Sequence, residues 1–189
     1  MYKRQDLVGV SLSSKIGKAC YIPIGHKSNK CIEKDLVLKK LKPLLEDPSI
    51  KKIGQNIKFD FIVFFKHGIN MTSMEDTMLM SYVLDAGKNR HNMDTLSEIH
   101  LNHKTISFKD LVGTGKKEIN FSEVDVEKAK DYAAEDADIT FRLYKKFQKS
   151  LKDEKMINIY EIFEKPLLKI LAFMEIEGVK IAVSYTHLR

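Results

Sequence analysis

One stretch of the chain constrains its fold more than any other. Residues 125–151 run for 27 positions without a glycine or a proline, which predicts one long helix. Within it Tyr132, Asp136, Ile139, Leu143 and Phe147 recur at steps of three and four residues, so they share one face of the helix. A helix of this length needs a partner surface for its apolar face. The remaining sequence must therefore supply a layer for it to cover.

Short apolar runs in the rest of the sequence predict strands for this layer. They alternate with helical patterns that are shorter than residues 125–151. A β-hairpin is expected from residues 6–13 and 19–24, with its turn at Gly17. Asn56 is the expected N-cap of a helix that Gly68 ends, and Pro166 either starts a new helical segment or kinks one. Strands that alternate with helices predict an α/β fold with a mixed sheet flanked by helices. Further strands are predicted at 51–54 and 69–72, and further helices at 34–46, 56–65, 76–84, 94–101, 108–112 and 157–175.

Composition limits the class of protein without identifying it. The 189 residues are 43% hydrophobic and carry a formal charge of +6, which allows one folded core and is compatible with a polyanionic partner. Cys20 and Cys31 lack metal-type spacing and are expected to be reduced thiols. No apolar run is long enough for a membrane span and no basic-then-apolar leader opens the chain. We therefore expect a soluble, cytoplasmic protein without a membrane partner.

Both ends of the sequence look foreign to the rest. Residues 1–5 lead into a strand without a turn or a cap, and residues 183–189 interrupt a Gly-Val-Lys-Ile run that reads as entering another element. We interpret both as non-native flanking sequence and the chain as an internal fragment of a longer protein.

Two acidic side chains stand in apolar surroundings. Asp136 lies on the inward face of the long helix, one turn after Tyr132, and Asp60 lies within Ile57–Val63. An inward carboxylate is costly unless it is paired or binds a cation, and hard divalent metals prefer such oxygens. Two interpretations stay open: a metal site, or structural contacts in which Asp136 caps or pairs with a neighbouring element and Lys58 neutralises Asp60.

The two motifs that contain these acids resemble those of a known family. Gly54-Gln-Asn-Ile-Lys-Phe-Asp60 resembles the second motif, and Tyr132-Ala-Ala-Glu-Asp136 the third, of the 3′–5′ exonuclease domain of the bacterial polymerase I family (family A DNA polymerases). That domain is a DEDD exonuclease of the tyrosine variant with a ribonuclease H-like fold. The resemblance covers residues 6–182 and extends to the connecting stretches 75–79, 90–96 and 103–106.

The resemblance implies a two-metal site for Mg²⁺ or Mn²⁺ and a role for each matching residue. Asp136 would bind the first metal directly, Asp60 would support the second through its water shell, and Tyr132 would orient the attacking water. Gln55 and Asn56 would contact the terminal nucleotides of a single-stranded 3′ end.

The resemblance also implies partners and a division of the chain. Residues 6–152 correspond to the exonuclease domain, and 153–182 to a helix that leads into the polymerase domain of the same parent chain. DNA with a single-stranded primer 3′ end is the implied substrate, in replication and repair, and a monomer is expected. Arg90, in the basic loop at 87–92, is a candidate phosphate contact or a solvated loop charge.

One departure from the family pattern concerns activity. The family carries an Asp-x-Glu on a first strand upstream of the hairpin, whereas here Asp6 is followed by Leu7 and Val8. The expected sheet therefore lacks its first strand, and two of four metal-binding carboxylates, so we predict a chain without appreciable nuclease activity. The alternatives are a degenerate scaffold and an RNA 3′-exonuclease of the ribonuclease D type. The inward acids argue against the first, and the resemblance of 163–168 and 175–181 to the polymerase connection argues against the second.

Overall fold

The computed structural model describes residues 7–27, 31–115 and 118–178. The interpretation of residues 1–5 and 183–189 as flanking sequence lies outside these ranges. The described elements, in chain order, are β1 (Gly9–Lys15), β2 (Lys18–Pro23), α1 (Lys34–Glu46), β3 (Lys52–Gly54), α2 (Ile57–Lys66), β4 (Met74–Asp76), α3 (Thr77–Asp85), α4 (Met93–Leu101), α5 (Phe108–Val112), η2 (Phe121–Glu123), α6 (Val126–Asp153), α7 (Ile157–Ile159), η3 (Tyr160–Glu164) and α8 (Lys165–Glu177).

The strands form two small sheets. β1 and β2 pair antiparallel, and Gly17 makes the turn between them with a φ of 75°, a conformation that glycine adopts without strain. β3 and β4 pair in parallel, from Lys52 opposite Met74 to Gly54 opposite Asp76. The predicted α/β class and the hairpin are confirmed. Within the described residues, however, no ladder joins β1 to β3, so the strands make one antiparallel and one parallel pair where a single mixed sheet was predicted.

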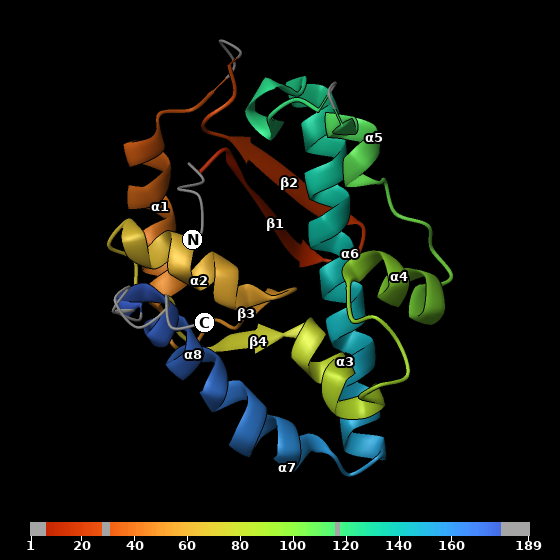
Figure 1. Ribbon diagram of the computed structural model, residues 1–189. Coiled ribbons are helices and arrows are strands. Elements are labelled where there is room, and N and C mark those ends of the chain that lie inside the picture. The colour runs from red at the N-terminus through yellow and green to blue at the C-terminus, as the bar shows by residue number, and fades with distance from the viewer. Residues whose placement is uncertain (1–6, 28–30, 116–117, 179–189) are drawn as a thin grey trace, which may run out of the picture.

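Helix α6 is the element that connects the two sheets (Figure 1). Asp125 caps it by accepting hydrogen bonds from the backbone N–H groups of Glu127 and Lys128, and the helix contacts β1, β2 and β3 as well as α3 and α4. The apolar part of its predicted inward face is confirmed, because Ile139, Leu143 and Phe147 are buried in one cluster. Leu151 extends that cluster. Each such side chain contributes about 1.5–3 kcal/mol through removal from water.

A second core lies on the other side of the strands. There α1 and α2 pack against the hairpin, and α8 covers α2 through Leu168 and Ala172 (Figure 1). Phe61 is fully buried and its ring meets those of Phe65 and Phe173, each at 5.7 Å between centroids. The two cores therefore flank the sheets, one formed around α6 and the other around α2.

Two predicted elements differ from the structure. Residues 69–72 form no strand, because their amide groups bond to helix ends: Ile69 donates to Phe64 and Thr72 donates to Leu45. The strand follows at β4 instead. The C-terminal helical region is divided, since η3, one turn of π-helix, separates α7 from α8 and Pro166 lies in the first turn of α8, where its absent N–H breaks no helical bond. No described helix is both long and apolar enough to cross a bilayer.

Candidate functional site

A cavity of about 960 Å³ lies between the two sheets. Residues of β1 and β3 border it on two sides, and α1, α2 and α6 supply the rest of its wall. Asp60 from α2 and Asp136 from α6 both line it. The fold thus brings the two acids predicted from separate motifs to one shared space.

Asp60 lies on α2 three residues after the buried Ile57 and four before the buried Phe64, so it flanks them on the same side of the helix. Its side chain is accessible from the cavity, yet the surrounding protein still removes much of its hydration. This desolvation, together with the nearby charge of Asp76, raises the pKa of Asp60 to about 7. Lys58 does not neutralise it, because its ammonium group pairs with Glu175 on α8. That alternative for Asp60 is therefore wrong.

Asp136 is half-buried where α6 meets the cavity. Burial raises its pKa to about 7, with further contributions from the charges of Glu135 and Asp94, while a hydrogen bond from Tyr132 acts in the opposite direction. Burial and the neighbouring Asp136 also raise the pKa of Tyr132. The phenol therefore keeps its proton and remains a hydrogen-bond donor beside the carboxylate.

The acids that flank Asp136 on the helix have structural contacts. Glu135 accepts from the Ile106 amide at 2.7 Å and contacts His103 at 2.8 Å. Asp138 accepts from the Gly17 amide at 2.6 Å and pairs with Arg142 at 2.6 Å. These contacts give Glu135 and Asp138 structural roles. Asp136 differs from them, because it borders the cavity and has Tyr132 as its hydrogen-bond partner.

The three predicted DNA contacts lie in different settings. The Gln55 amide is held at both ends, donating to the carbonyl of His91 at 2.7 Å and accepting from Thr77 at 2.5 Å. Asn56 is exposed, with a left-handed φ of 57°, and its side chain does not cap α2. Asn56 therefore occupies the predicted N-cap position of α2, but its side chain makes no capping hydrogen bond there. Arg90 is exposed in the loop between α3 and α4, so the structure brings it into no contact with the two acids.

Asp76 supplies the cap that Asn56 does not. Its carboxylate accepts from the amides of Asn56 and Ile57 at 3.1 and 2.9 Å, and from those of Met78 and Leu79 at 2.9 and 3.3 Å. One buried side chain therefore caps both α2 and α3. At α3, Asp76 caps the helix that the sequence predicts at 76–84. The cap of α2 has no local sequence signal, because only the parallel pairing of β3 with β4 brings Asp76 beside residues about 20 positions earlier.

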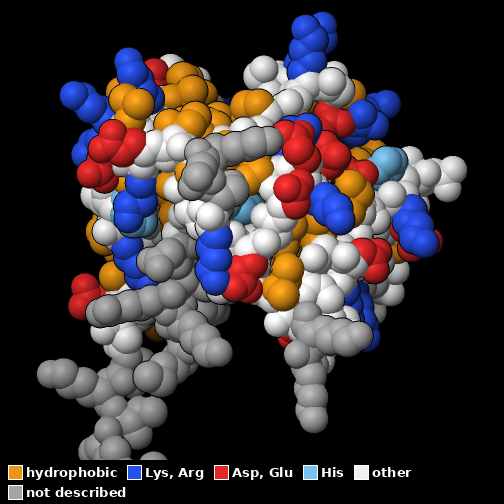
Figure 2. Space-filling view, turned by 90° about the horizontal axis from the view of Figure 1, so that it is seen from above, with side chains coloured by type: hydrophobic (Ala, Val, Ile, Leu, Met, Phe, Trp, Pro, Cys, Tyr) orange, Lys and Arg blue, Asp and Glu red, His pale blue; other side chains and the backbone are white. Residues whose placement is uncertain are grey.

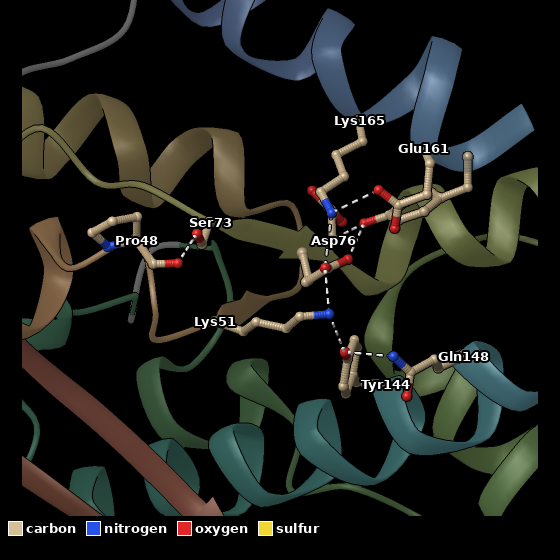
Figure 3. Close-up of polar contacts among 10 residues, drawn as sticks. Pro48, Lys51, Ser73, Asp76, Tyr144, Gln148, Glu161 and Lys165 are labelled. Carbon is tan, nitrogen blue, oxygen red and sulfur yellow. Dashed lines mark hydrogen bonds and ion pairs between the residues drawn. The ribbon is translucent and has the colours of Figure 1, made fainter. Parts of the chain in front are cut away.

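A buried ion-pair cluster lies next to this double cap. Glu75 is almost inaccessible and receives Lys165 at 2.8 Å, Lys51 at 3.2 Å and the Tyr160 hydroxyl at 3.1 Å. Figure 3 shows Lys51 and Lys165 approaching from opposite sides. The Tyr160 hydroxyl also accepts the Asp76 amide at 2.9 Å. This cluster joins β4 to η3 through Tyr160 and to α8 through Lys165. It thereby supports Asp76, which caps the N-terminus of α2.

The described residues offer a partial metal site. They contain no group of three or more Asp, Glu, His or Cys side chains gathered closely enough to hold a metal ion. Mg²⁺ is often bound through one or two protein carboxylates, with waters and substrate phosphate oxygens completing its shell. Asp60 and Asp136 fit that open kind of coordination, and they do not form a closed protein cage.

Comparison with known proteins defines the class. Residues 1–152 match the family model described as 3′–5′ exonuclease, and the chain belongs to this family. Solved structures agree on the fold: an "apo form of the nuclease" superposes with a TM-score of 0.70 at 21% identity, covering 90% of this chain and 76% of that one. NrnC of Brucella melitensis gives a TM-score of 0.68 at 21% identity over 95% of this chain and 81% of that one.

Two similar sequences are bacterial DNA polymerases I. The chain is 41% identical to DNA polymerase I of Rhizobium leguminosarum, over 93% of this chain and 19% of that protein. It is 39% identical to DNA polymerase I of Pseudomonas aeruginosa, over 93% of this chain and 20% of the relative. The chain therefore spans about one fifth of the length of these relatives. Its residues 1–152 are the part that matches the 3′–5′ exonuclease family model.

The raised pKa values of both cavity acids predict a pH dependence of stability. Because each pKa rises from 3.8 to about 7 on folding, the protonated forms favour the folded state and ionisation opposes it. In metal-free buffer the melting temperature should therefore fall as the pH rises from about 4 to about 8. Circular dichroism can compare the chain with a variant carrying Asp60→Asn and Asp136→Asn. The same slope in both proteins would contradict this assignment, since the variant should depend less on pH.

Proposed function

We propose that this chain is the 3′–5′ exonuclease part of a bacterial DNA polymerase I, which removes mismatched 3′-terminal nucleotides from DNA. One observation carries the proposal: Asp60 and Asp136, from different helices, line one cavity, and the lysine beside Asp60 is paired elsewhere. Bound Mg²⁺ or Mn²⁺ would supply Lewis-acid stabilisation and an activated water. A purely structural scaffold would have no need for two costly cavity-facing acids.

Each residue of the site then has a defined task. Asp136 would hold one ion directly, and Asp60 would support the other through its water shell. Tyr132, kept protonated by its raised pKa, would donate a hydrogen bond that orients the attacking water. Gln55, fixed by Thr77 and the His91 carbonyl, presents a rigid edge to the terminal base.

Two exposed residues extend the proposed contact with DNA. Asn56 offers a free amide beside Gln55, and Arg90 offers a guanidinium group for a backbone phosphate. Figure 2 shows basic and acidic side chains interspersed over one face of the molecule, without a single large basic field. We propose that these few contacts at the 3′ end carry DNA recognition.

The C-terminal helices support a polymerase domain as partner within the same protein. Ile162, Phe163, Ile170 and Met174 are 56–66% exposed at helical spacing, while the opposite side of α8 is buried against α2. A helix that is apolar on both sides is normally covered. Because the polymerase I relatives are about five times longer than this chain, we propose that their polymerase portion covers this face.

The two cavity acids alone are too few for a two-metal reaction, so we propose that the isolated chain does not cut DNA. The test uses a 5′-labelled DNA with a mismatched 3′ end, incubated with the chain and Mg²⁺ or Mn²⁺ and resolved on a gel. No shortening is expected. Metal-dependent shortening that Asp136→Ala abolishes would show that this chain suffices for cleavage and would contradict the proposal that it does not cut DNA.

A further inference from the structure

The Gln55 side chain lies in a closed circuit of hydrogen bonds. Its amide nitrogen donates to the carbonyl oxygen of His91 at 2.7 Å, and its amide oxygen accepts from the Thr77 hydroxyl at 2.5 Å. The imidazole Nδ1 atom of His91 shares a hydrogen bond of 2.9 Å with the Ser81 hydroxyl. Thr77 and Ser81 lie four residues apart on α3, so they occupy neighbouring positions on one face of that helix and close the circuit. We call these four residues the Gln55 clamp.

Helix α3 is a fixed base for the clamp. Thr77 and Ser81 are 0% and 1% exposed, and α3 packs against α6. Buried hydroxyl groups are costly unless they form hydrogen bonds. Ser81 meets this need through the His91 imidazole. Thr77 meets it through Gln55 and through the Gly54 carbonyl at 3.1 Å. The two hydroxyls therefore tie the end of β3 and the loop before α4 to a helix that is itself held in the core.

The clamp gives the Gln55 amide one orientation. A carbonyl oxygen can only accept, so the amide NH₂ group must face His91 and the amide oxygen must face Thr77. The reversed amide would set two acceptor oxygens against each other. These contacts use one N–H group and one oxygen lone pair of the amide, which leaves one of each. Gln55 lines the cavity together with Asp60 and Asp136, so a nucleotide that reaches the two acids meets an amide that is already oriented.

The position of the His91 carbonyl depends on the anchored imidazole. His91 lies near the end of the loop between α3 and α4, and residues 86–90 before it are exposed. Its imidazole is held by Ser81 and packs edge-on against Tyr82, with 5.6 Å between the ring centroids. Both partners come from α3. Without the Ser81 contact, the carbonyl that orients Gln55 would be carried by the end of an exposed loop, and the orientation would be lost.

We propose that Ser81 and His91 are positioning residues for the 3′ end of a DNA strand. Neither side chain needs to touch the DNA. Both act through Gln55, whose amide they hold ready for the terminal nucleotide, so binding does not have to order a free glutamine side chain. This assignment rests on the proposed function, because it requires that Gln55 contacts the DNA, and it adds the residues that set the geometry of that contact.

The test is a double-mutant cycle on DNA affinity. Fluorescence anisotropy measures the binding of a labelled single-stranded DNA with a free 3′ end to the whole chain, in EDTA so that metal-dependent cleavage cannot occur. Ser81→Ala should weaken binding by roughly tenfold. In a chain that already carries Gln55→Ala, the same substitution should cause no further loss, because the effects of coupled residues are not additive. A purely structural effect would weaken both backgrounds equally.

Further variants separate the clamp from general damage to the fold. Ser97→Ala also removes a fully buried hydroxyl, which donates to the His103 carbonyl at 2.8 Å, and it should leave the DNA affinity unchanged. His91→Leu removes the hydrogen bond to Ser81 and should bind DNA as weakly as Ser81→Ala. His91→Asn keeps a polar group near the position of Nδ1 and should bind DNA like the unsubstituted chain.

Several results would overturn the proposal. Equal losses from Ser81→Ala in the unsubstituted and Gln55→Ala backgrounds, or an equal loss from Ser97→Ala, would reduce the role of Ser81 to general stability. Full affinity in Ser81→Ala or His91→Leu, while Gln55→Ala weakens binding, would remove the clamp and leave the DNA contact of Gln55 standing. If Gln55→Ala itself leaves the affinity unchanged, that contact fails too, and the proposed function loses it together with the clamp.

Discussion

Replacing Asp76 with alanine is expected to lower the free energy of unfolding by about 3 kcal/mol, the largest loss expected from one side chain near the site. Four backbone amides, those of Asn56, Ile57, Met78 and Leu79, lose their acceptor. Loss of a single helix cap typically costs about 1 kcal/mol. This side chain caps two helices and is buried, so water cannot readily replace it.

Urea unfolding of the Asp76→Ala variant measures this loss, and Asp125→Ala is a matched control. Asp125 caps only α6 and is exposed, so its replacement should cost about 1 kcal/mol. The loss of unfolding free energy for Asp76→Asn should lie between those for Asp76→Ala and Asp125→Ala. The asparagine amide keeps one acceptor oxygen, but it presents N–H groups where the backbone amides need an acceptor. Equal losses for Asp76→Ala and Asp125→Ala would contradict the double cap.

The second large effect concerns catalysis. An extended chain can be made by adding at the N-terminus the segment that precedes the matched region in DNA polymerase I of Rhizobium leguminosarum. In this extended chain, Asp136→Ala should lower the rate of 3′-nucleotide release about 10³-fold, because loss of a metal ligand removes several kcal/mol of transition-state stabilisation. Single-turnover trimming of a labelled DNA measures the rate. Asp131→Ala provides the control on the same helix, since Asp131 is exposed and paired with Lys130 at 3.6 Å. Similar losses in both variants would contradict a specific role for Asp136.

Local sequence predicted the helices well. The bounds of α1 and α5 agree with the prediction, and the long helix was identified from its lack of glycine and proline and its apolar spacing. These features depend on residues close together in the chain. The strand at 69–72 was wrong because Ile69 and Met71 are buried apolar residues like those of a strand, although their backbones bond to helix ends.

The remaining features depend on contacts between distant segments. No local pattern indicates that Lys58 pairs with Glu175, that Asp76 caps α2, or that Thr77 and the His91 carbonyl hold Gln55. Each of these contacts arises only after parallel strands and helices have packed together. The position of Asp60 and Asp136 on one cavity was expected from the family resemblance, and the structure brings both to that cavity.

The most direct test of the account is to locate the metal in the extended chain. A crystal soaked with Mn²⁺ and a short single-stranded DNA should show anomalous scattering from an ion bound to the Asp136 carboxylate, at about the 2.1 Å typical of Mg²⁺–oxygen bonds. Asp60 should lie at the water shell of a second ion, and the terminal phosphate should contact the ion at Asp136. Manganese bound at another site, with no ion at Asp136 in a crystal that contains the DNA, would contradict the assignment of this cavity as a nuclease centre.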